Sequence, residues 1–159
     1  MADQAFRAKR VDREFSARVG VGPEAVFPLL CPVREREWVR GWDAEVVFSA
    51  SGVAEDGCVF RNDLAGRGCG TWVVTRHEPP RAVEFAVFWA EGYLERLRVD
   101  LAPAPGGGTD HRWRRSYTGL SEEGNRRIEE VAGPALKARM RRLFAELEHF
   151  LATGHILAS

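Results

Sequence analysis

The chain has 159 residues, 45% of them hydrophobic and 29% charged, which is typical of a globular domain large enough to hold an interior cavity. Lys plus Arg and Asp plus Glu balance at 23 each, so no overall charge exists to collect nucleic acid or an acidic membrane surface. No apolar run approaches the roughly 18 residues of a membrane span, and the start MADQAFRAKR lacks the apolar region of a signal peptide. We expect a cytoplasmic protein that forms one domain over residues 1–159, with its core at about 12–153.

The first part of the chain predicts a strand followed by short helices. Apolar residues alternate over 13–21, as in a half-buried strand. The segment Gly22-Pro23-Glu24 is typical of a helix start, because proline is tolerated in the first turn and an acidic residue suits the positive helix end. Prolines interrupt this helix by residue 32, and we expect a further turn or two of helix over 34–42.

A series of six further strands follows. The segments between them (SG, EDG, AGRG, PPR, EG and APAPGGG) contain turn-forming residues. Short strands joined by short turns pair antiparallel with their neighbours. The expected strands cover 44–50, 58–63, 70–78, 82–90, 93–101 and 109–118.

The last element is a long amphipathic helix. Ser121 is a typical N-cap, and apolar residues then recur every three or four positions from Ile128 to Leu151. Gly133-Pro134 predicts a kink, because proline lacks the N–H that the helix needs there, and Gly154 is a typical stop. Such a helix buries its apolar stripe against the concave face of a curved sheet.

The element order predicts an α+β fold. A curved seven-stranded antiparallel sheet wraps on the long C-terminal helix, with two short helices between strands 1 and 2. Packing of this kind leaves a cavity between sheet and helix.

The chain resembles the START/Bet v 1-like (SRPBCC) helix-grip superfamily, in its polyketide cyclase/dehydrase-like branch. The resemblance covers about 15–151 and is carried by GPEAVFPLLCPVREREWVRGW, GCVF, TWVVTRHEPPRAVEF and YTGLSEEGNRRI. It implies binding of a hydrophobic small molecule under the helix. Some members of the superfamily are cyclases, dehydratases or hydrolases, and others are co-chaperones.

Two charged residues occupy positions where the strand pattern demands core residues. Glu95 lies in an apolar row of one strand, and Arg115 lies in an apolar row of the next. A turn centred near 104–106 would place the two directly opposite each other, whereas a two-residue slip would make the pair diagonal. The pair is either a polar anchor for a ligand or a structural ion pair near the open end of the sheet.

Further residues are expected to line the same pocket. Asn62 shares a face with Cys58 and Phe60, so its amide is a candidate ligand contact, although it could instead bond to a turn. Glu35, Trp38 and Trp42 share one helix face, where the tryptophans are more simply explained as core. The full predicted ligand-binding set is Glu95, Arg115, Asn62, Tyr93, Trp113, Tyr117, Met140 and Phe144.

Motifs for several other kinds of site are missing from the sequence. Cys31, Cys58 and Cys69 have no CxxC spacing, and the four histidines form no metal-binding pattern such as HExxH. Neither GxSxG nor GxGxxG is present. We assign no catalytic residue, no metal and no cofactor.

The leading hypothesis is binding of a hydrophobic small molecule of lipid, polyketide or aromatic type. The alternative is a cyclase or dehydratase acting on a polyketide-like substrate, with Glu95 as acid or base. A third interpretation, a protein-interaction module using the outer sheet face, conflicts with the charges expected there. The outward row contains Arg96, Arg98, Asp100, Arg112 and Arg114. We expect no nucleic-acid partner, and the sequence leaves both a monomer and a homodimer open.

Overall fold

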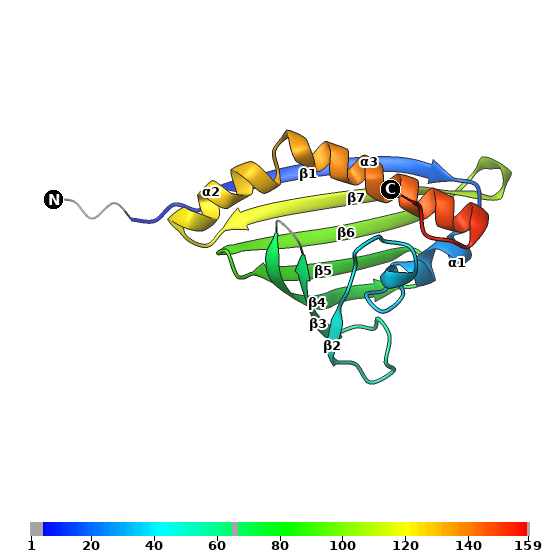
Figure 1. Ribbon diagram of the computed structural model, residues 1–159, viewed down its shortest axis with the longest axis horizontal. Helices are drawn as coiled ribbons and strands as arrows, with labels where there is room; N and C mark the ends of the chain where they lie inside the picture. The colour runs from blue at the N-terminus through cyan, green and yellow to red at the C-terminus, as the bar shows by residue number, and fades with distance from the viewer. Residues whose placement is uncertain (1–4, 65–66, 159) are drawn as a thin grey trace.

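The computed structural model describes residues 5–64 and 67–158. The described residues form one antiparallel sheet in the order β1-β7-β6-β5-β4-β3-β2, with short helices between β1 and β2 and longer ones after β7 (Figure 1). The expected α+β fold is therefore confirmed. The strands are β1 (Arg10–Val19), β2 (Glu45–Phe48), β3 (Val59–Leu64), β4 (Gly68–Glu78), β5 (Ala82–Trp89), β6 (Tyr93–Ala104) and β7 (Gly108–Gly119). The helices are α1 (Pro23–Val26), η1 (Phe27–Leu29), η2 (Glu35–Glu37), η3 (Pro105–Gly107), α2 (Glu122–Val131) and α3 (Pro134–Thr153).

The ends of the chain meet at one edge of the sheet. β1 pairs with β7 along its whole length, from Arg10 opposite Thr118 to Val19 opposite Thr109. The expected first strand at 13–21 was therefore placed about three residues too late, because its limits are set by this distant partner and not by local alternation. The other sequence neighbours from β2 to β7 pair as a meander. Part of the expected AGRG turn, residues 65–66, lies outside the described residues.

The expected kinked helix is two separate helices. The Ser121 side chain accepts a hydrogen bond from the Gly124 N–H at 3.0 Å, which confirms the predicted N-cap of α2. The chain leaves helical geometry at Gly133, and Pro134 then occupies the first turn of α3, where its missing N–H costs nothing. Gly154 ends α3 with φ of 73°, a conformation that glycine adopts without strain.

The helix expected over 34–42 is present but shorter than predicted. Only the single turn η2 forms, and the backbone departs from helical geometry at Trp38. The Trp38 indole is fully buried and donates to the Leu29 carbonyl at 2.9 Å, while the Trp42 indole donates to the Pro32 carbonyl at 2.9 Å. These tertiary bonds hold the segment as a compact loop. The interpretation of Trp38 as core is confirmed.

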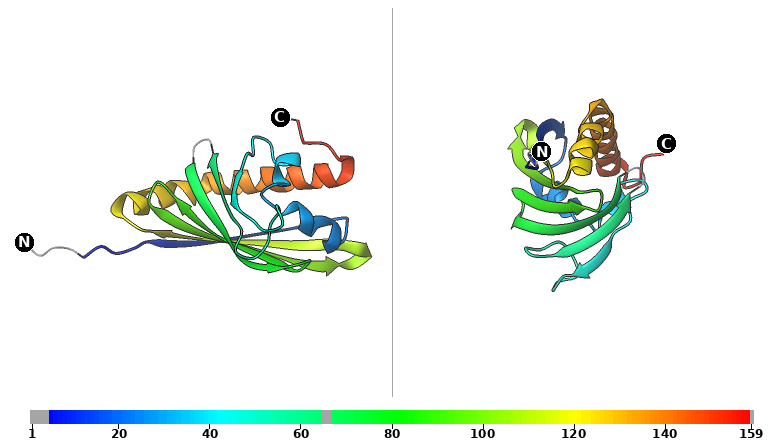
Figure 2. Two further views of the ribbon diagram at one scale, coloured as in Figure 1. Left: turned by 90° about the horizontal axis from the view of Figure 1, so that it is seen from below. Right: turned by 90° about the vertical axis from the view of Figure 1, so that its left-hand side faces the viewer.

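The core lies between the concave face of the sheet and α3. Figure 2 shows the sheet curving around one side of the helix, with the loop before β2 rising toward it. Alternate residues of every long strand point into this space, and α3 contributes Leu136, Met140 and Leu147. No helix of the described chain is long and apolar enough to cross a membrane.

Candidate functional site

Two charged side chains of neighbouring strands enter the core together. Along β6, the residues from Tyr93 to Leu101 at odd positions are buried, and Glu95 is one of them, with 0% of its surface exposed. Along β7, Arg115 lies between buried Trp113 and Tyr117 and is itself 7% exposed. Strand alternation therefore brings both charges to the inner face, as the sequence pattern predicts.

The expected register of these strands is wrong by two residues. Glu95 lies opposite Tyr117, and Arg115 lies opposite Leu97, so the charged pair is diagonal. The reason is the length of the hairpin. Strand pairing continues to Ala104 opposite Gly108, and the turn needs only Pro105–Gly107 because two glycines there take positive φ angles of 79° and 85°.

A second arginine completes the cluster around Glu95. Arg115 Nη1 contacts one carboxylate oxygen of Glu95, and Arg67 Nη2 donates to the other at 2.6 Å. The Trp89 indole donates to the same oxygen as Arg67 at 3.2 Å, and the Arg67 guanidinium lies 4.4 Å from the centre of the Trp89 ring. Both oxygens of Glu95 are therefore occupied by donors.

Electrostatics keep Glu95 ionised. Burial alone would raise the pKa of its carboxyl, but Arg115 and Arg67 outweigh burial and hold this pKa below its ordinary value. An ionised carboxylate with two arginine partners is a poor proton donor and a weak base. Glu95 is suited to holding the two guanidiniums in position.

Two tyrosines adjoin the cluster and have buried hydroxyls. Tyr93 and Tyr117 are fully buried, and their ring centres are 6.3 Å apart. Burial raises the pKa of Tyr93 to about 12, and the nearby Arg67 only partly offsets this effect. The Tyr93 hydroxyl and the Arg67 guanidinium are not aligned for a hydrogen bond. Neither tyrosine hydroxyl has a partner in the described part of the protein.

The other predicted residues lie in two further places. Trp113 and Phe144 pack together with ring centres 5.8 Å apart, and Met140 is buried on the same helix as Phe144. The Arg115 guanidinium lies 6.0 Å from the Trp113 ring centre, which links this aromatic group to the charged cluster. Asn62 is buried on β3, which is separated from β6 by β5 and β4, and its side-chain oxygen accepts from the Trp72 indole at 2.9 Å.

Sequence reasoning missed the contributions of Arg67, Trp89, His111 and Glu35. Arg67 comes from a turn segment, where no periodic pattern indicates burial. His111 is buried on β7, with its ring centre 4.8 Å from that of Phe144, and burial lowers its pKa to about 4. Glu35 is partly buried in η2, and desolvation raises its pKa to about 8 although the positive charge of Arg115 opposes the shift. Of these four residues, only Trp89 and His111 could have been found from the sequence, because the alternation along β5 and β7 places them on the inner face of the sheet.

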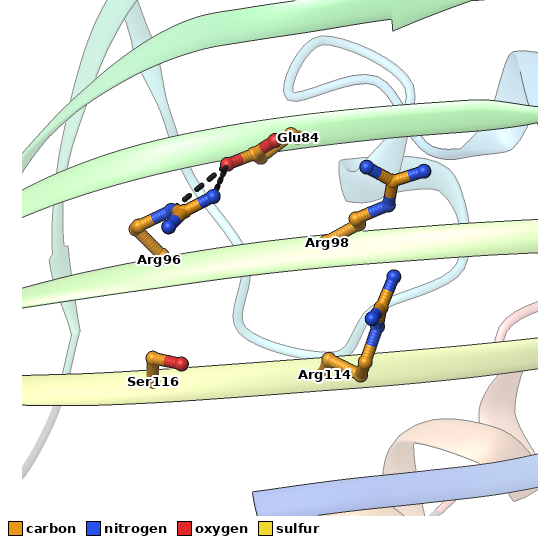
Figure 3. A pocket seen from close by; sticks show the side chains of 5 residues that line it. All are labelled: Glu84, Arg96, Arg98, Arg114 and Ser116. Carbon is orange, nitrogen blue, oxygen red and sulfur yellow. Dashed lines mark hydrogen bonds and ion pairs between the residues drawn. The ribbon is translucent and has the colours of Figure 1, made fainter. Parts of the chain in front are cut away.

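Two surface hollows in the described chain lie away from this cluster. One, of about 210 Å³, lies on the outer face of the sheet, where Arg96 binds Glu84 and the Arg114 side chain extends toward Arg98 (Figure 3). Each of its three arginines is paired with a carboxylate, Arg96 with Glu84 and both Arg98 and Arg114 with Asp100. The other, of about 370 Å³, lies at the sheet edge and is lined by Asp43, Ala44, Glu45, Arg61, Asn62, Asp63, Cys69, Gly70 and Thr71.

The edge hollow approaches the interior at Gly70. A Cβ atom at this position would lie 2.9 Å from the Trp89 ring and 3.1 Å from the Asn62 side-chain oxygen. Glycine therefore allows β4 to pass close to the indole that bonds Glu95. Within residues 5–64 and 67–158, no three side chains of His, Cys, Asp or Glu are grouped as metal ligands.

Comparisons with known proteins identify the fold. No family model matches the chain, and no curated protein is similar to it. An uncharacterised protein from Rhizobium leguminosarum is 17% identical, with a TM-score of 0.68 over 92% of this chain and 97% of that one. CalU16 from Micromonospora echinospora is 16% identical, with a TM-score of 0.58 over 93% of this chain and 84% of its own.

A third similar structure is DynU16, a protein of the dynemicin biosynthetic locus. It is 17% identical with a TM-score of 0.64, and the match covers 91% of this chain and 48% of DynU16. At these identities the likeness concerns the fold alone. The chain has a helix-grip-like fold, and this fold is compatible with ligand binding.

Proposed function

We propose that the protein binds a small, largely apolar molecule between the concave face of the sheet and α3. The lipid, polyketide and aromatic classes all match an interior rich in tryptophan and tyrosine. The observation that carries the proposal is the cluster in which fully buried Glu95 is held by Arg115, which is 7% exposed, and by Arg67, whose side chain is 13% exposed. Buried ion pairs contribute little net stability compared with apolar residues of similar volume, so selection for stability alone gives no reason to keep them.

Unsatisfied polar atoms support the same conclusion. Among the residues that the structure describes, no hydrogen-bond partner is found for buried Arg67 Nε, Arg115 Nε and the hydroxyls of Tyr93 and Tyr117. Each such atom costs roughly 1–3 kcal/mol if it stays unpaired. Four of them around one carboxylate are explained if a guest molecule supplies the missing acceptors.

The rest of the pocket is apolar. We assign Trp113, Met140 and Phe144 to contacts with the body of the guest. The aromatic rings supply large contact areas that need no specific partner.

The enzyme alternative, with Glu95 as acid or base, has less support. The lowered pKa of Glu95 and the occupation of both its oxygens by donors disfavour proton transfer. A binding role uses the same residues without requiring Glu95 to titrate.

Native mass spectrometry of protein purified from its own host tests the proposal. We expect a co-purified apolar molecule in the wild type and its loss in Arg115→Met, with thermal unfolding used to confirm that the variant is folded. Empty wild-type protein that turns over a cyclisable polyketide-like substrate, and loses this activity in Glu95→Gln, would favour the enzyme instead.

A further inference from the structure

The buried polar atoms without partners have one property in common. All of them are hydrogen-bond donors or hydroxyls that can donate, because His111 receives a bond at Nδ1 from the Trp113 indole and so carries its proton at Nε2. Within the described chain they are Asn62 Nδ2, Arg67 Nε, Tyr93 Oη, His111 Nε2, Arg115 Nε and Tyr117 Oη. The interior therefore lacks acceptors, not donors.

The charge balance of the cluster also indicates that a negatively charged acceptor is missing. Glu95 is bonded to the buried Arg115 and to the partly buried Arg67, which leaves an excess positive charge. Glu35 does not neutralise the excess, because with a pKa of about 8 it is mostly protonated at neutral pH.

We propose that the guest of this pocket is an apolar acid whose carboxylate is received by Tyr93, Tyr117, Arg67 and Arg115. The inference rests on the proposed function and names the chemical class of its ligand. A carboxylate accepts about four hydrogen bonds and donates none, which matches the four unpartnered donors beside Glu95. Its negative charge offsets the second arginine, and charge-assisted bonds of this kind are about twice as strong as neutral ones.

Other head groups match this cluster less well. An alcohol brings a donor of its own into a region that already has too many, and it leaves the positive charge uncompensated. An amine adds a like charge beside two arginines. Water alone could satisfy the hydroxyls but leaves the charge of the second arginine without a counterion.

Titration calorimetry with matched probes tests the inference. The probes are decanoate with 1-decanol and 2-naphthoate with 2-naphthalenemethanol, so that each pair differs in its head group. We expect each acid to bind at least about tenfold more tightly than its alcohol, a difference of about 1.4 kcal/mol. Tyr93→Phe and Tyr117→Phe should each reduce acid affinity about three- to tenfold and leave alcohol affinity unchanged.

Phe144→Leu is the matched control. It shortens an apolar contact far from the head group, so it should weaken the acid and the alcohol of a pair by the same factor. The tyrosine variants remove hydroxyls that bond nothing in the described part of the protein, so we expect them to fold with unchanged circular dichroism.

The possible outcomes separate the two proposals. Alcohols that bind as tightly as the acids would overturn the carboxylate inference and leave the binding function standing. An acid preference that survives in the double variant Tyr93→Phe/Tyr117→Phe would also overturn it, because the carboxylate would then lie elsewhere. Failure of all four probes to bind would contradict the binding function and this inference together.

Discussion

Strand β6 presents the same chemical arrangement on both of its faces. On the inner face Glu95 is held between Arg67 and Arg115, and on the outer face Asp100 is held between Arg98 and Arg114 at 2.9 and 3.0 Å. The Glu95 side chain is 0% exposed, whereas that of Asp100 is 23% exposed.

The difference in burial gives the two clusters different roles. In both, the arginines hold the pKa of the carboxyl below its ordinary value although burial opposes them. Water screens the outer cluster and can solvate any partner that is lost, so its ion pairs contribute little to stability. The inner cluster is shielded from water, so each of its charges depends on the others or on a guest.

The largest effect expected from this comparison is the loss of the inner carboxylate. Glu95→Gln leaves two arginines in the core without their counterion, and we expect the free energy of unfolding to fall by about 3–5 kcal/mol. The matched change Asp100→Asn on the outer face should cost no more than about 1 kcal/mol. Urea denaturation of both variants measures the difference, and equal losses would contradict the contrast between the two faces.

Removal of the whole inner cluster should not lower the free energy of unfolding as Glu95→Gln does. In Arg67→Met/Glu95→Leu/Arg115→Met, apolar side chains of similar volume replace the charges, and we expect stability to be unchanged or to rise by up to about 4 kcal/mol. Binding of decanoate should be lost. A triple variant that is as unstable as Glu95→Gln would show that the cluster is needed for folding itself.

Glu35 should make the protein less stable as the pH rises. Its folded pKa of about 8 exceeds its ordinary value of 4.5, so the stability it contributes is complete below about pH 4.5 and is lost as the pH rises through 8. Glu35→Gln should remove this loss and stabilise the protein by about 2–3 kcal/mol at pH 8, less than the full shift because the side chain is partly exposed. Thermal melts between pH 4.5 and 9 test this expectation.

Glu37 provides the control, because it lies on the same turn but binds Arg34 at 3.0 Å at the surface. This hydrogen bond lowers the pKa of Glu37. Glu37→Gln should therefore leave the decline of stability above pH 4.5 in place. If Glu35→Gln leaves that decline unchanged as well, the assignment to Glu35 is wrong.

His111 should produce a smaller effect on the acid side. Its folded pKa of about 4 lies below its ordinary value of 6.5, so its contribution is complete above pH 6.5 and is lost as the pH falls through 4. His111→Asn keeps an acceptor for the Trp113 indole and should flatten the stability profile there by about 1–3 kcal/mol. Replacement of the exposed His155 in His155→Asn is the control. If the wild type and His111→Asn lose stability identically as the pH falls, His111 is not the group responsible.

Much of the site could be predicted from local sequence. A period of two places Glu95 and Arg115 inside, because every second residue of a strand points to the same face whatever its charge. The order of elements and the capping residues Ser121 and Gly154 predict the helices that cover the sheet. These features depend on neighbours a few residues away.

The sequence by itself thus determined which residues of the regular strands and helices face the core, while the tertiary structure decided which of them meet and which loop residues join them. The diagonal contact of Glu95 with Arg115 depends on the turn that two glycines allow, and Arg67 reaches Glu95 from 28 residues away only because the sheet curves. The unusual protonation of Glu35 and His111 is likewise a consequence of desolvation by distant segments. Such burial is a property of the closed fold, and local patterns of charge and periodicity do not encode it.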